Sequence, residues 1–252
     1  MPKSPSYLDQ HFLVDEAVIN NLVEESRIVA SDVVLEIGAG KGALTTEIAR
    51  HAKHVYAIEK DKSFRKSLGS LPKNVTVLYG DALEELKDLK FNVIISNPPF
   101  SMVEPLFKKI IFIKLEKAML ITGKSFLQLL SDAASKWHLI IQLFYDFRLV
   151  QMIGKDAFEP EPRTQAALIE FTPRRSGLSA HEEILREIIL QGDKKLKNAL
   201  VYSLLRLNKL TKKQASDKIA KLDISDDVLY DKVWHISSED FLEVARKIEK
   251  II

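Results

Sequence analysis

The sequence predicts an α/β protein with a mostly parallel sheet, followed by a small all-helical domain. Three observations predict this class. Short apolar runs alternate with amphipathic stretches over the first two thirds of the chain, which is typical of parallel strands joined by helices. A proline-rich segment then separates two further strand candidates. After Gly177 the pattern is helical to the end, with no strand-like run.

The composition limits the class of protein. A chain of 252 residues with 46% hydrophobic content can bury one large core and one small one. The first ten residues lack a signal-peptide core, and no stretch approaches ~18 uncharged apolar residues. We therefore expect a soluble cytoplasmic protein with no membrane partner. Cysteine is absent, which excludes disulfides, thiolate nucleophiles and cysteine zinc sites, and no metal site is predicted.

Apolar runs bounded by polar segments mark the predicted parallel strands, which are Val33 to Ile37, Val55 to Glu59, Val75 to Tyr79, Val93 to Ser96 and Ala118 to Thr122. The interval from Ser125 to Tyr145 has helical spacing. Its apolar residues fall near one face, which we expect to be core: Phe126, Leu129, Leu130, Ala133 and Trp137.

Two later strand candidates, Phe147 to Ile153 and Ala166 to Phe171, are separated by FEPEPRTQ. Its prolines fit neither a helix interior nor a central strand, so we expect an antiparallel hairpin at the sheet edge. Pro173 to Gly177 reads as a linker. The predicted domains are therefore residues 1–174 and 178–252, with Ser225 and Ser238 as helix caps in the second.

Charges segregate in the helical tail. Asp193 to Lys221 holds nine Lys or Arg against two Asp, whereas Asp223 to Asp240 holds six acids against Lys232 alone. A basic stripe of this kind fits a surface that faces a polyanion, and it equally fits an ordinary solvated helix face. The net charge of +2 is too balanced to indicate nucleic acid by itself.

A glycine-rich turn, VVLEIGAGKG, joins the first strand to a helix-like stretch and contains Glu36, Gly38, Gly40 and Gly42. Glycine permits a tight turn and lets a ligand approach the backbone closely. The spacing is G-x-G-x-G and not the dinucleotide G-x-G-x-x-G. Taken alone, the turn fits a cofactor loop or a plain turn.

Acids end the next two strands. Glu59 follows the loop by about twenty residues, where doubly wound folds place an acid that accepts from both ribose hydroxyls. Asp81, in YGDAL, is suited to accept from an adenine amino group. Each acid has a plainer interpretation as a helix cap or a solvated side chain. Three successive strand ends that supply Gly, Glu and Asp predict a nucleoside cofactor, with Lys60 and Ala82 as neighbouring contacts.

The fourth strand end, Asn97-Pro98-Pro99-Phe100, predicts the reaction. Hydride transfer does not require it, whereas methyl transfer to an exocyclic amine does. The lone pair of adenine's amine is delocalised into the ring. The Asn97 carboxamide oxygen and the Pro98 carbonyl would each accept an amine hydrogen and polarise the nitrogen. Phe100 would stack on the base. The plainer interpretation is a proline turn with a core phenylalanine, but the context favours an S-adenosylmethionine site.

On these residues the chain resembles, over nearly its whole length, the rRNA adenine N6,N6-dimethyltransferases of the KsgA type. LEIGAGKGALT is similar to the family's cofactor loop, which implies Glu36, Gly38 and Gly40 as cofactor contacts. The family's ribose, adenine and catalytic positions fall on Glu59, Asp81 and Asn97, and Asn97 is also expected to contact the cofactor. DQHFL is similar to the family's Q-x-F-L element. That similarity implies three residues that close over S-adenosylmethionine: Gln10, His11 and Leu13.

The resemblance continues through the second half. FEPEP is similar to the family's F-x-P-x-P loop, which implies Phe158 as the second aromatic wall of the target-base pocket. GDKKLKNAL, Gly192 to Leu200, is similar to a degraded form of its basic R-K-x-L-R-x-A-L segment. The family implies a Rossmann-like class I methyltransferase sheet with one antiparallel edge strand, and a small helical domain that helps to bind RNA.

Two departures from the family pattern matter. Pro98 and Phe100 stand where the family usually has the leucine and tyrosine of N-L-P-Y, so the carbonyl and the ring are retained and the hydroxyl is not. N-P-P-F also fits amino methylases more broadly, which leaves monomethylation open. In Gly123 to Tyr145 the family's glutamine-glutamate-alanine-x-arginine signature is replaced by GKSFLQLLSDAASKWH.

The resulting prediction is an S-adenosylmethionine-dependent enzyme that dimethylates N6 of adjacent adenines near the 3′ end of small-subunit rRNA. We expect a monomer that acts on the rRNA or the pre-small subunit. The alternatives are a non-catalytic ribosome assembly factor that keeps the fold, and an N6-adenine monomethylase of other RNA or DNA. The predicted phosphate contacts are Lys194, Lys195, Lys197, Arg206, Lys209, Lys212 and Lys213.

Overall fold

The structure is a computed structural model that describes residues 10–250. The chain forms two compact units, each described here by itself. Unit 1 comprises the residues up to 127 together with 147–173, and unit 2 comprises 128–146 together with the residues from 174 onward. Unit 2 is therefore assembled from two separate stretches of sequence. None of the described helices is long and apolar enough to span a membrane.

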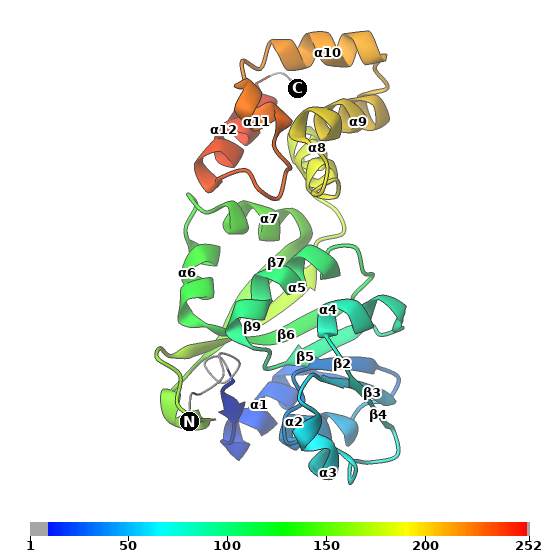
Figure 1. Ribbon diagram of the computed structural model, residues 1–252, viewed down its shortest axis with the longest axis vertical. Coiled ribbons are helices and arrows are strands. Elements are labelled where there is room, and N and C mark those ends of the chain that lie inside the picture. Colours follow the sequence, from blue (N-terminus) through cyan, green and yellow to red (C-terminus); the bar gives the residue numbers. More distant parts are fainter. Residues whose placement is uncertain (1–9, 251–252) are drawn as a thin grey trace. The chain divides into compact units, whose positions relative to one another are not determined.

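The core of unit 1 is a seven-stranded sheet (Figure 1). Its strands are β2 (Val33–Ile37), β3 (His54–Glu59), β4 (Val75–Tyr79), β5 (Val93–Ser96), β6 (Lys117–Gly123), β7 (Tyr145–Ile153) and β9 (Ala166–Pro173). They lie in the order β4-β3-β2-β5-β6-β9-β7. A separate pair is formed by β1 (Phe12–Leu13) and β8 (Phe158–Glu159), which run antiparallel.

The five predicted parallel strands are confirmed. β2 to β6 are rich in the β-branched residues that suit a buried strand, and each pairs in parallel with its neighbour. The chain runs outward from β2 through β3 to β4, and then returns to place β5 on the other side of β2. This reversal is a topological switch point, and ligands of open α/β sheets bind in the crevice at the carboxyl ends of the strands there.

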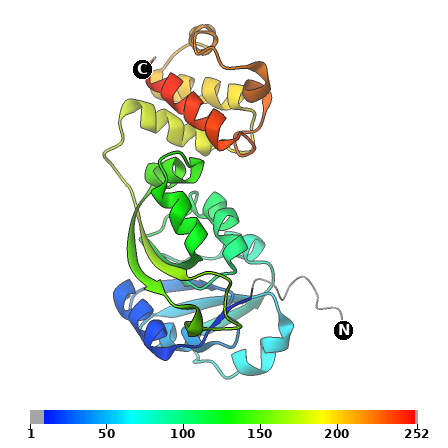
Figure 2. The same ribbon diagram turned by 90° about the vertical axis from the view of Figure 1, so that its left-hand side faces the viewer.

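The antiparallel strand is not at the edge. β9 pairs antiparallel with β6, with Leu120 opposite Ile169, and β7 lies beyond it as the edge strand (Figure 2). The predicted pairing of the two late strands is confirmed, because β9 and β7 are hydrogen-bonded neighbours. The prediction placed the antiparallel strand one position too far out. Sequence periodicity specifies which residues pair within a hairpin, but not which arm of the hairpin joins the sheet.

Helices cover both faces of the sheet, as predicted. The helices of unit 1 are α1 (Glu16–Ser26), α2 (Ala43–Ala49), α3 (Arg65–Leu68), α4 (Ala82–Glu85) and α5 (Val103–Ile110). Leu22 of α1 and Ile48 of α2 are buried in one cluster with Leu168 of β9. Because side chains alternate along a strand, Phe171 points to the opposite face, where Phe107 of α5 meets it at 4.8 Å between ring centroids.

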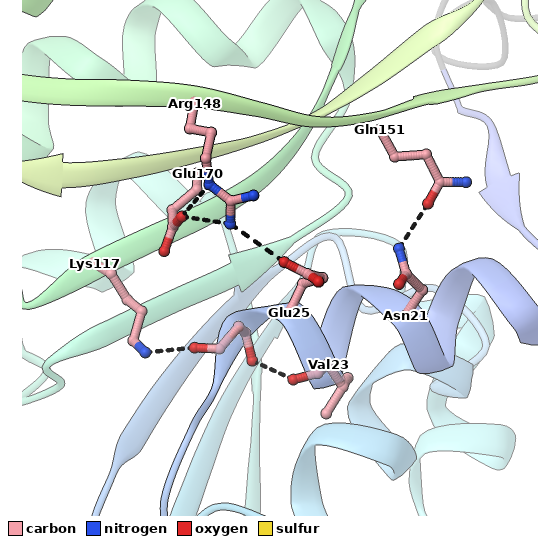
Figure 3. Close-up of polar contacts among 8 residues, drawn as sticks. Asn21, Val23, Glu25, Lys117, Arg148, Gln151 and Glu170 are labelled. Carbon is pink, nitrogen blue, oxygen red and sulfur yellow. Dashed lines mark hydrogen bonds and ion pairs between the residues drawn. The ribbon is translucent and has the colours of Figure 1, made fainter.

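Polar contacts fasten α1 to the edge of the sheet (Figure 3). Arg148 of β7 donates to Glu170 of β9 at 2.8 Å and to Glu25 of α1 at 3.2 Å. Asn21, about one helical turn before Glu25, donates from Nδ2 to Gln151 Oε1 at 2.6 Å. A solvent-exposed ion pair by itself stabilises little, but these contacts specify where α1 lies against the two strands. α1 is thereby held against β7 and β9.

The predicted helix from Ser125 to Tyr145 is two helices, α6 (Lys124–Ser131) and α7 (Lys136–Phe144). Asp132 Oδ1 accepts from the Ala134 amide at 2.9 Å, and the Ser135 hydroxyl accepts from the Trp137 amide at 3.1 Å. These two side chains compete with the helical hydrogen bonds and start a new helix. Ala133, predicted to be core, is consequently exposed.

Unit 2 is helical, as predicted. Besides α7 it contains α8 (Ala180–Ile189), α9 (Leu196–Asn208), α10 (Lys212–Ala220), α11 (Asp226–Tyr230) and α12 (Ser238–Glu249). The buried Lys136 of α7 donates to the carbonyls of Val233 and Ile236, each at 2.8 Å. Ser225 is the N-cap of α11. The cap of α12 is Ser237 and not the predicted Ser238, because the Ser237 hydroxyl accepts from the Asp240 amide.

Candidate active site

A cavity of about 360 Å³ lies at the carboxyl ends of the central strands of unit 1. Its size falls in the usual range of small-molecule sites, roughly 300 to 1,000 Å³. The cavity brings together seven of the residues predicted to bind the cofactor: Gln10, His11, Gly38, Glu59, Lys60, Ala82 and Asn97. Its other walls were not predicted, and they are Phe12, Ile37, Ile58, Gly80, Pro99, Ser101 and Met102.

The glycine-rich turn is shaped by left-handed backbone. Gly38 and Gly40 have φ of 77° and 55°, a conformation that side chains disfavour. A Cβ on Gly40 would lie 2.9 Å from the ring of Phe12. On Gly38 it would approach Pro99 Cδ at 3.5 Å and the Asn97 carbonyl oxygen at 3.7 Å. The turn therefore needs glycine for its conformation, and at Gly40 it also needs glycine for the close approach of the Phe12 ring.

Glu59 holds this turn against the end of β3. Its Oε2 accepts from the Gly40 amide at 2.8 Å, and its Oε1 accepts from the Asp61 amide at 2.8 Å. Each carboxylate oxygen has a further lone pair. Glu59 therefore stabilises the loop and still presents acceptors to the cavity that it lines.

Glu36, the other acid of the turn, is only 2% exposed and does not line the cavity. Burial raises the pKa of its carboxyl to about 8, and the neighbouring Glu59 adds to the rise while the Thr45 hydroxyl opposes it. One carboxyl oxygen has no hydrogen-bond partner among the described residues. A buried carboxyl in this state is protonated at neutral pH and can donate a hydrogen bond.

In this structure Asp81 acts as a helix cap, which is the simpler of the two roles predicted for it. It is the N-cap of α4, and its Oδ1 accepts from the Leu83 amide at 3.0 Å. Its other oxygen lies 3.4 Å from Lys60 Nζ, in a pair that is exposed to solvent. Gly80 and Ala82 on either side of it line the cavity, and Asp81 itself does not. Contact between Asp81 and an adenine amino group remains a prediction.

Two hydrogen-bond acceptors are left open at the end of β5. Asn97 Nδ2 donates to the main-chain carbonyl of His11 at 2.9 Å. Within residues 10–250, no hydrogen bond reaches Asn97 Oδ1 or the Pro98 carbonyl oxygen. The Pro99 carbonyl, in contrast, accepts from the Met102 amide at 2.8 Å. The turn therefore leaves a side-chain oxygen and a main-chain oxygen available for an amine with two hydrogens.

The two predicted aromatic walls differ in exposure. Phe100 is partly buried, and its ring lies 5.8 Å from that of His11 at an interplanar angle of 39°. On another side, a Cβ on Gly123 would lie 3.1 Å from Phe100 Cδ2. Phe158 is only 3% exposed and belongs to the hydrophobic core, so in this structure its ring is not available to a base. Its role as a wall of the target pocket remains a prediction.

The segment before α1 closes one side of the cavity. The short β1–β8 pair places Leu13 opposite Phe158, and the Leu13 side chain is buried. Phe12 points the other way, with its ring 5.4 Å from that of Phe64 and against Gly40. Period-2 alternation through Q-x-F-L would have indicated Phe12 and not Leu13 as the residue that faces the cavity. Asp9 of the motif lies outside the described residues.

In unit 2 the predicted phosphate contacts are not equivalent. Lys197 Nζ donates to the Tyr230 hydroxyl at 2.9 Å, and Lys195 Nζ lies 5.4 Å from the same ring. Arg206 donates to both carboxylate oxygens of the buried Glu187 at 2.8 Å. Substitution of Arg206 would therefore disturb the packing of unit 2 as well as its charge. The remaining predicted contacts, in and beside α9 and α10, are exposed: Lys194, Lys209, Lys212 and Lys213.

Comparison with known proteins gives consistent matches. Residues 3–239 match the family described as ribosomal RNA adenine dimethylase. The probable ribosomal RNA small subunit methyltransferase A of Thermococcus sibiricus is 31% identical over 253 residues, 96% of this chain and 91% of that protein. The protein of the same description from Methanococcus maripaludis strain C6 is 30% identical over 251 residues, covering 92% and 95% of the two chains.

Solved structures with similar folds agree in architecture. A dimethyladenosine transferase from Plasmodium falciparum superposes with a TM-score of 0.62 at 23% identity, covering 96% of this chain and 98% of its own. The 23S rRNA methyltransferase ErmE superposes with a TM-score of 0.61 at 19% identity, covering 94% and 99%. At these identities the likeness shows a shared class I methyltransferase fold.

Proposed function

The chain belongs to the ribosomal RNA adenine dimethylase family, and from this premise we propose that it dimethylates N6 of two adjacent adenines near the 3′ end of small-subunit rRNA. Family membership makes the protein an rRNA adenine methyltransferase. The choice of subunit and of adenines is the proposal, and it is supported by the small-subunit description that its archaeal relatives carry.

The observation that carries the reaction is the pair of open acceptors after β5. Adenine's amine has two hydrogens, and Asn97 Oδ1 and the Pro98 carbonyl are two oxygens at this strand end that accept no hydrogen bond from the described residues. When both accept, electron density shifts onto the amine nitrogen and its lone pair becomes less delocalised into the ring. Fixed acceptors of this kind need no reorganisation during the reaction. Neither a hydride-transfer enzyme nor a plain proline turn requires this arrangement.

The cavity fits S-adenosylmethionine by the donors and acceptors it presents. Glu59 retains lone pairs for a ribose diol, and Ile37, Ile58 and Met102 offer apolar walls for an adenine ring. Gly38 lines the cavity without a side chain, and a Cβ on Gly40 would press on the ring of Phe12, which forms one of its walls. When bound, S-adenosylmethionine supplies an electrophilic methyl group, and the amine that receives it loses a proton to solvent.

The target base must leave its stack to reach Asn97. A nucleotide in a loop or in a partly assembled subunit is therefore a cheaper substrate than one in a closed duplex. Phe100 offers a ring for the unstacked base, and stacking of this type contributes about 1–3 kcal/mol. In the same proposal Phe158 is the second wall, and it would have to leave the core to reach the base.

We assign RNA binding to the exposed basic residues of unit 2, and we propose that the enzyme acts as a cytoplasmic monomer on the pre-small subunit. The support is the excess of nine basic over two acidic residues in Asp193 to Lys221. Lysine contacts to phosphate release counterions, so binding should weaken steeply with salt.

The test uses small subunits that lack the modification. They are incubated with methyl-labelled S-adenosylmethionine, and the RNA is digested for mass spectrometry. Label in dimethyladenosine at two adjacent positions is the expected result. Asn97→Ala should abolish transfer while cofactor affinity stays within a few fold, because the side chain bonds to His11 and not to the glycine turn.

Label in monomethyladenosine alone would instead support the alternative that N-P-P-F favours, in which the absent tyrosine hydroxyl limits the enzyme to one methylation. Binding of the subunit without any transfer would support the assembly-factor alternative. Transfer at an undiminished rate by Asn97→Ala would refute the assignment of the amine-polarising group.

A further inference from the structure

The carboxamide of Asn97 is oriented by a residue that lies 86 positions earlier in the chain. Its Nδ2 group donates to the main-chain carbonyl of His11 at 2.9 Å. A carboxamide is planar, with the nitrogen and the oxygen on opposite sides of Cγ. Once Nδ2 faces His11, Oδ1 must face away from it. This matters because a flipped carboxamide would present hydrogens to an incoming amine, and two donors cannot bond to each other.

The His11 main chain is itself held by its side chain. The ring Nδ1 lies 2.9 Å from the carbonyl oxygen of Pro160. Since a carbonyl only accepts, Nδ1 carries the proton in this contact. The ring also lies 5.8 Å from that of Phe100. Immediately after His11, the β1–β8 pair sets Phe12 opposite Glu159, next to Pro160.

These contacts join three segments that are far apart in sequence. The Q-x-F-L segment, the end of β5 and the FEPEP loop meet at the single residue His11. The far end of the Q-x-F-L segment is held as well, because Val14 and Asp15 both donate their amides to the Ala157 carbonyl, at 2.9 Å and 3.3 Å. His11 is thus the point at which the FEPEP loop is coupled to the Asn97 carboxamide.

We propose that His11 is a positioning residue for methyl transfer. Its Nδ1–H bond to Pro160 and its contact with Phe100 hold its carbonyl where it orients the Asn97 carboxamide, with Oδ1 toward the target amine. This inference rests on the proposed function of Asn97. It also gives His11 a task distinct from the cofactor contact that the family resemblance implies, since the task is directed at the amine.

Two substitutions separate the hydrogen bond from the bulk of the ring. Asparagine carries its Nδ2 on Cγ, as histidine carries Nδ1, so His11→Asn keeps a donor for the Pro160 carbonyl. His11→Leu has a comparable branched side chain at the same position and has no donor. The proposal requires these two variants to differ in the same direction in two independent measurements.

The first measurement needs no substrate. In protein labelled with ¹⁵N-asparagine, the Nδ2 signals of Asn97 are identified by their loss in Asn97→Ala. Asn208, an exposed asparagine at the end of α9, provides the reference for a side-chain amide in water. We expect slow hydrogen exchange and a downfield proton for Asn97 in the wild type and in His11→Asn. In His11→Leu both features should move toward those of Asn208.

The second measurement is single-turnover methylation of unmodified small subunits at saturating cofactor. We expect His11→Leu to lower the rate about tenfold, the size of effect that the loss of one orienting hydrogen bond produces. His11→Asn should stay within about threefold of the wild type. His11 also lines the cavity, so equilibrium binding measures the cofactor Kd separately, and the rate at saturating cofactor should fall by more than the affinity.

The outcomes test the positioning role of His11 separately from the proposed methyltransferase function. An Asn97 signal that is unchanged in His11→Leu would overturn the positioning role, even if the enzyme methylates normally. Equal rates for His11→Leu and His11→Asn would overturn it as well, since the hydrogen bond would then be irrelevant. If the wild type methylates no subunit and the Asn97 signals still follow the expected order, the proposed function fails and the orientation of Asn97 by His11 is supported.

Discussion

Glu36 should make unit 1 less stable as the pH rises, and Glu36→Gln should remove that dependence. Burial raises the pKa of this carboxyl from 4.5 to about 8. The folded protein therefore holds the proton between these two pH values, whereas the unfolded chain releases it. Stability is complete below the unfolded pKa and falls as the pH rises toward the folded pKa. The group is fully buried, so solvent screening does not reduce the effect.

The expected size follows from the width of this window. The free energy of unfolding falls by about 1.4 kcal/mol per pH unit, so at pH 7 the wild type has lost roughly 3 kcal/mol relative to pH 4.5. Glutamine has the shape of the protonated carboxyl and does not titrate. Glu36→Gln should therefore exceed the wild type by about 3 kcal/mol at pH 7, and the difference should shrink as the pH approaches 4.5.

Urea unfolding at pH 5, 6, 7 and 8 measures this difference. Circular dichroism is the appropriate signal, because both tryptophans, Trp137 and Trp234, lie in unit 2 and do not report on β2. Glu116→Gln changes an exposed glutamate of unit 1 and serves as the control, with a profile parallel to the wild type. A flat wild-type profile, or a Glu36→Gln profile parallel to it, would show that Glu36 is not protonated in the folded protein.

Three further predictions concern the site and the tail. Gly40→Ala should lower cofactor affinity at least tenfold in calorimetry, because its Cβ would lie 2.9 Å from Phe12. The control Gly177→Ala is also at positive φ but has nothing within 4 Å, and it should leave cofactor affinity unchanged. Gly123→Ala should displace Phe100, because the added Cβ would lie 3.1 Å from the Phe100 ring. It should slow single-turnover transfer without weakening cofactor binding. An unchanged rate would show that the position of the Phe100 ring does not affect catalysis. Neutralising exposed basic residues around α10 should flatten the salt dependence of RNA binding by roughly 2 in log–log slope, a change that three neutralised lysines of unit 1 should not reproduce. The residues to neutralise are Lys209, Lys212 and Lys213.

Much of unit 1 was readable from local sequence. The parallel strands were predicted nearly to the residue, because runs such as VVLEI and VIIS are β-branched, apolar and bounded by polar turns. The position of the cavity followed from a topological rule, since the carboxyl ends of neighbouring parallel strands meet at one edge. Gly38, Glu59 and Asn97 were placed in one site by this rule, and the structure brings them together.

The direction in which individual side chains point was harder to predict from the sequence. Leu13 was expected at the cofactor, but its neighbour Phe12 faces the cavity, because one residue along a strand reverses the face. Asp81 follows a strand, as predicted, but it serves as a helix cap, because its side chain accepts a hydrogen bond from the Leu83 amide two residues later. The sequence did not predict the break between α6 and α7 at Asp132 to Ser135. The helical spacing of apolar residues continues through this segment, but the side chains of Asp132 and Ser135 bond to backbone amides and end one helix and begin the next.

Local sequence was sufficient to identify most of the strands and helices, the positions of the main turns, and the chemical groups at the strand ends. These depend on spacing and on local side-chain chemistry, which act over a few residues. Three features required the folded chain: β9 lies between β6 and β7, Glu36 is buried enough to hold its proton, and the Asn97 side chain bonds to His11, 86 residues earlier. Those outcomes depend on which surfaces exclude water and which distant segments meet, and no local pattern in the chain specifies either.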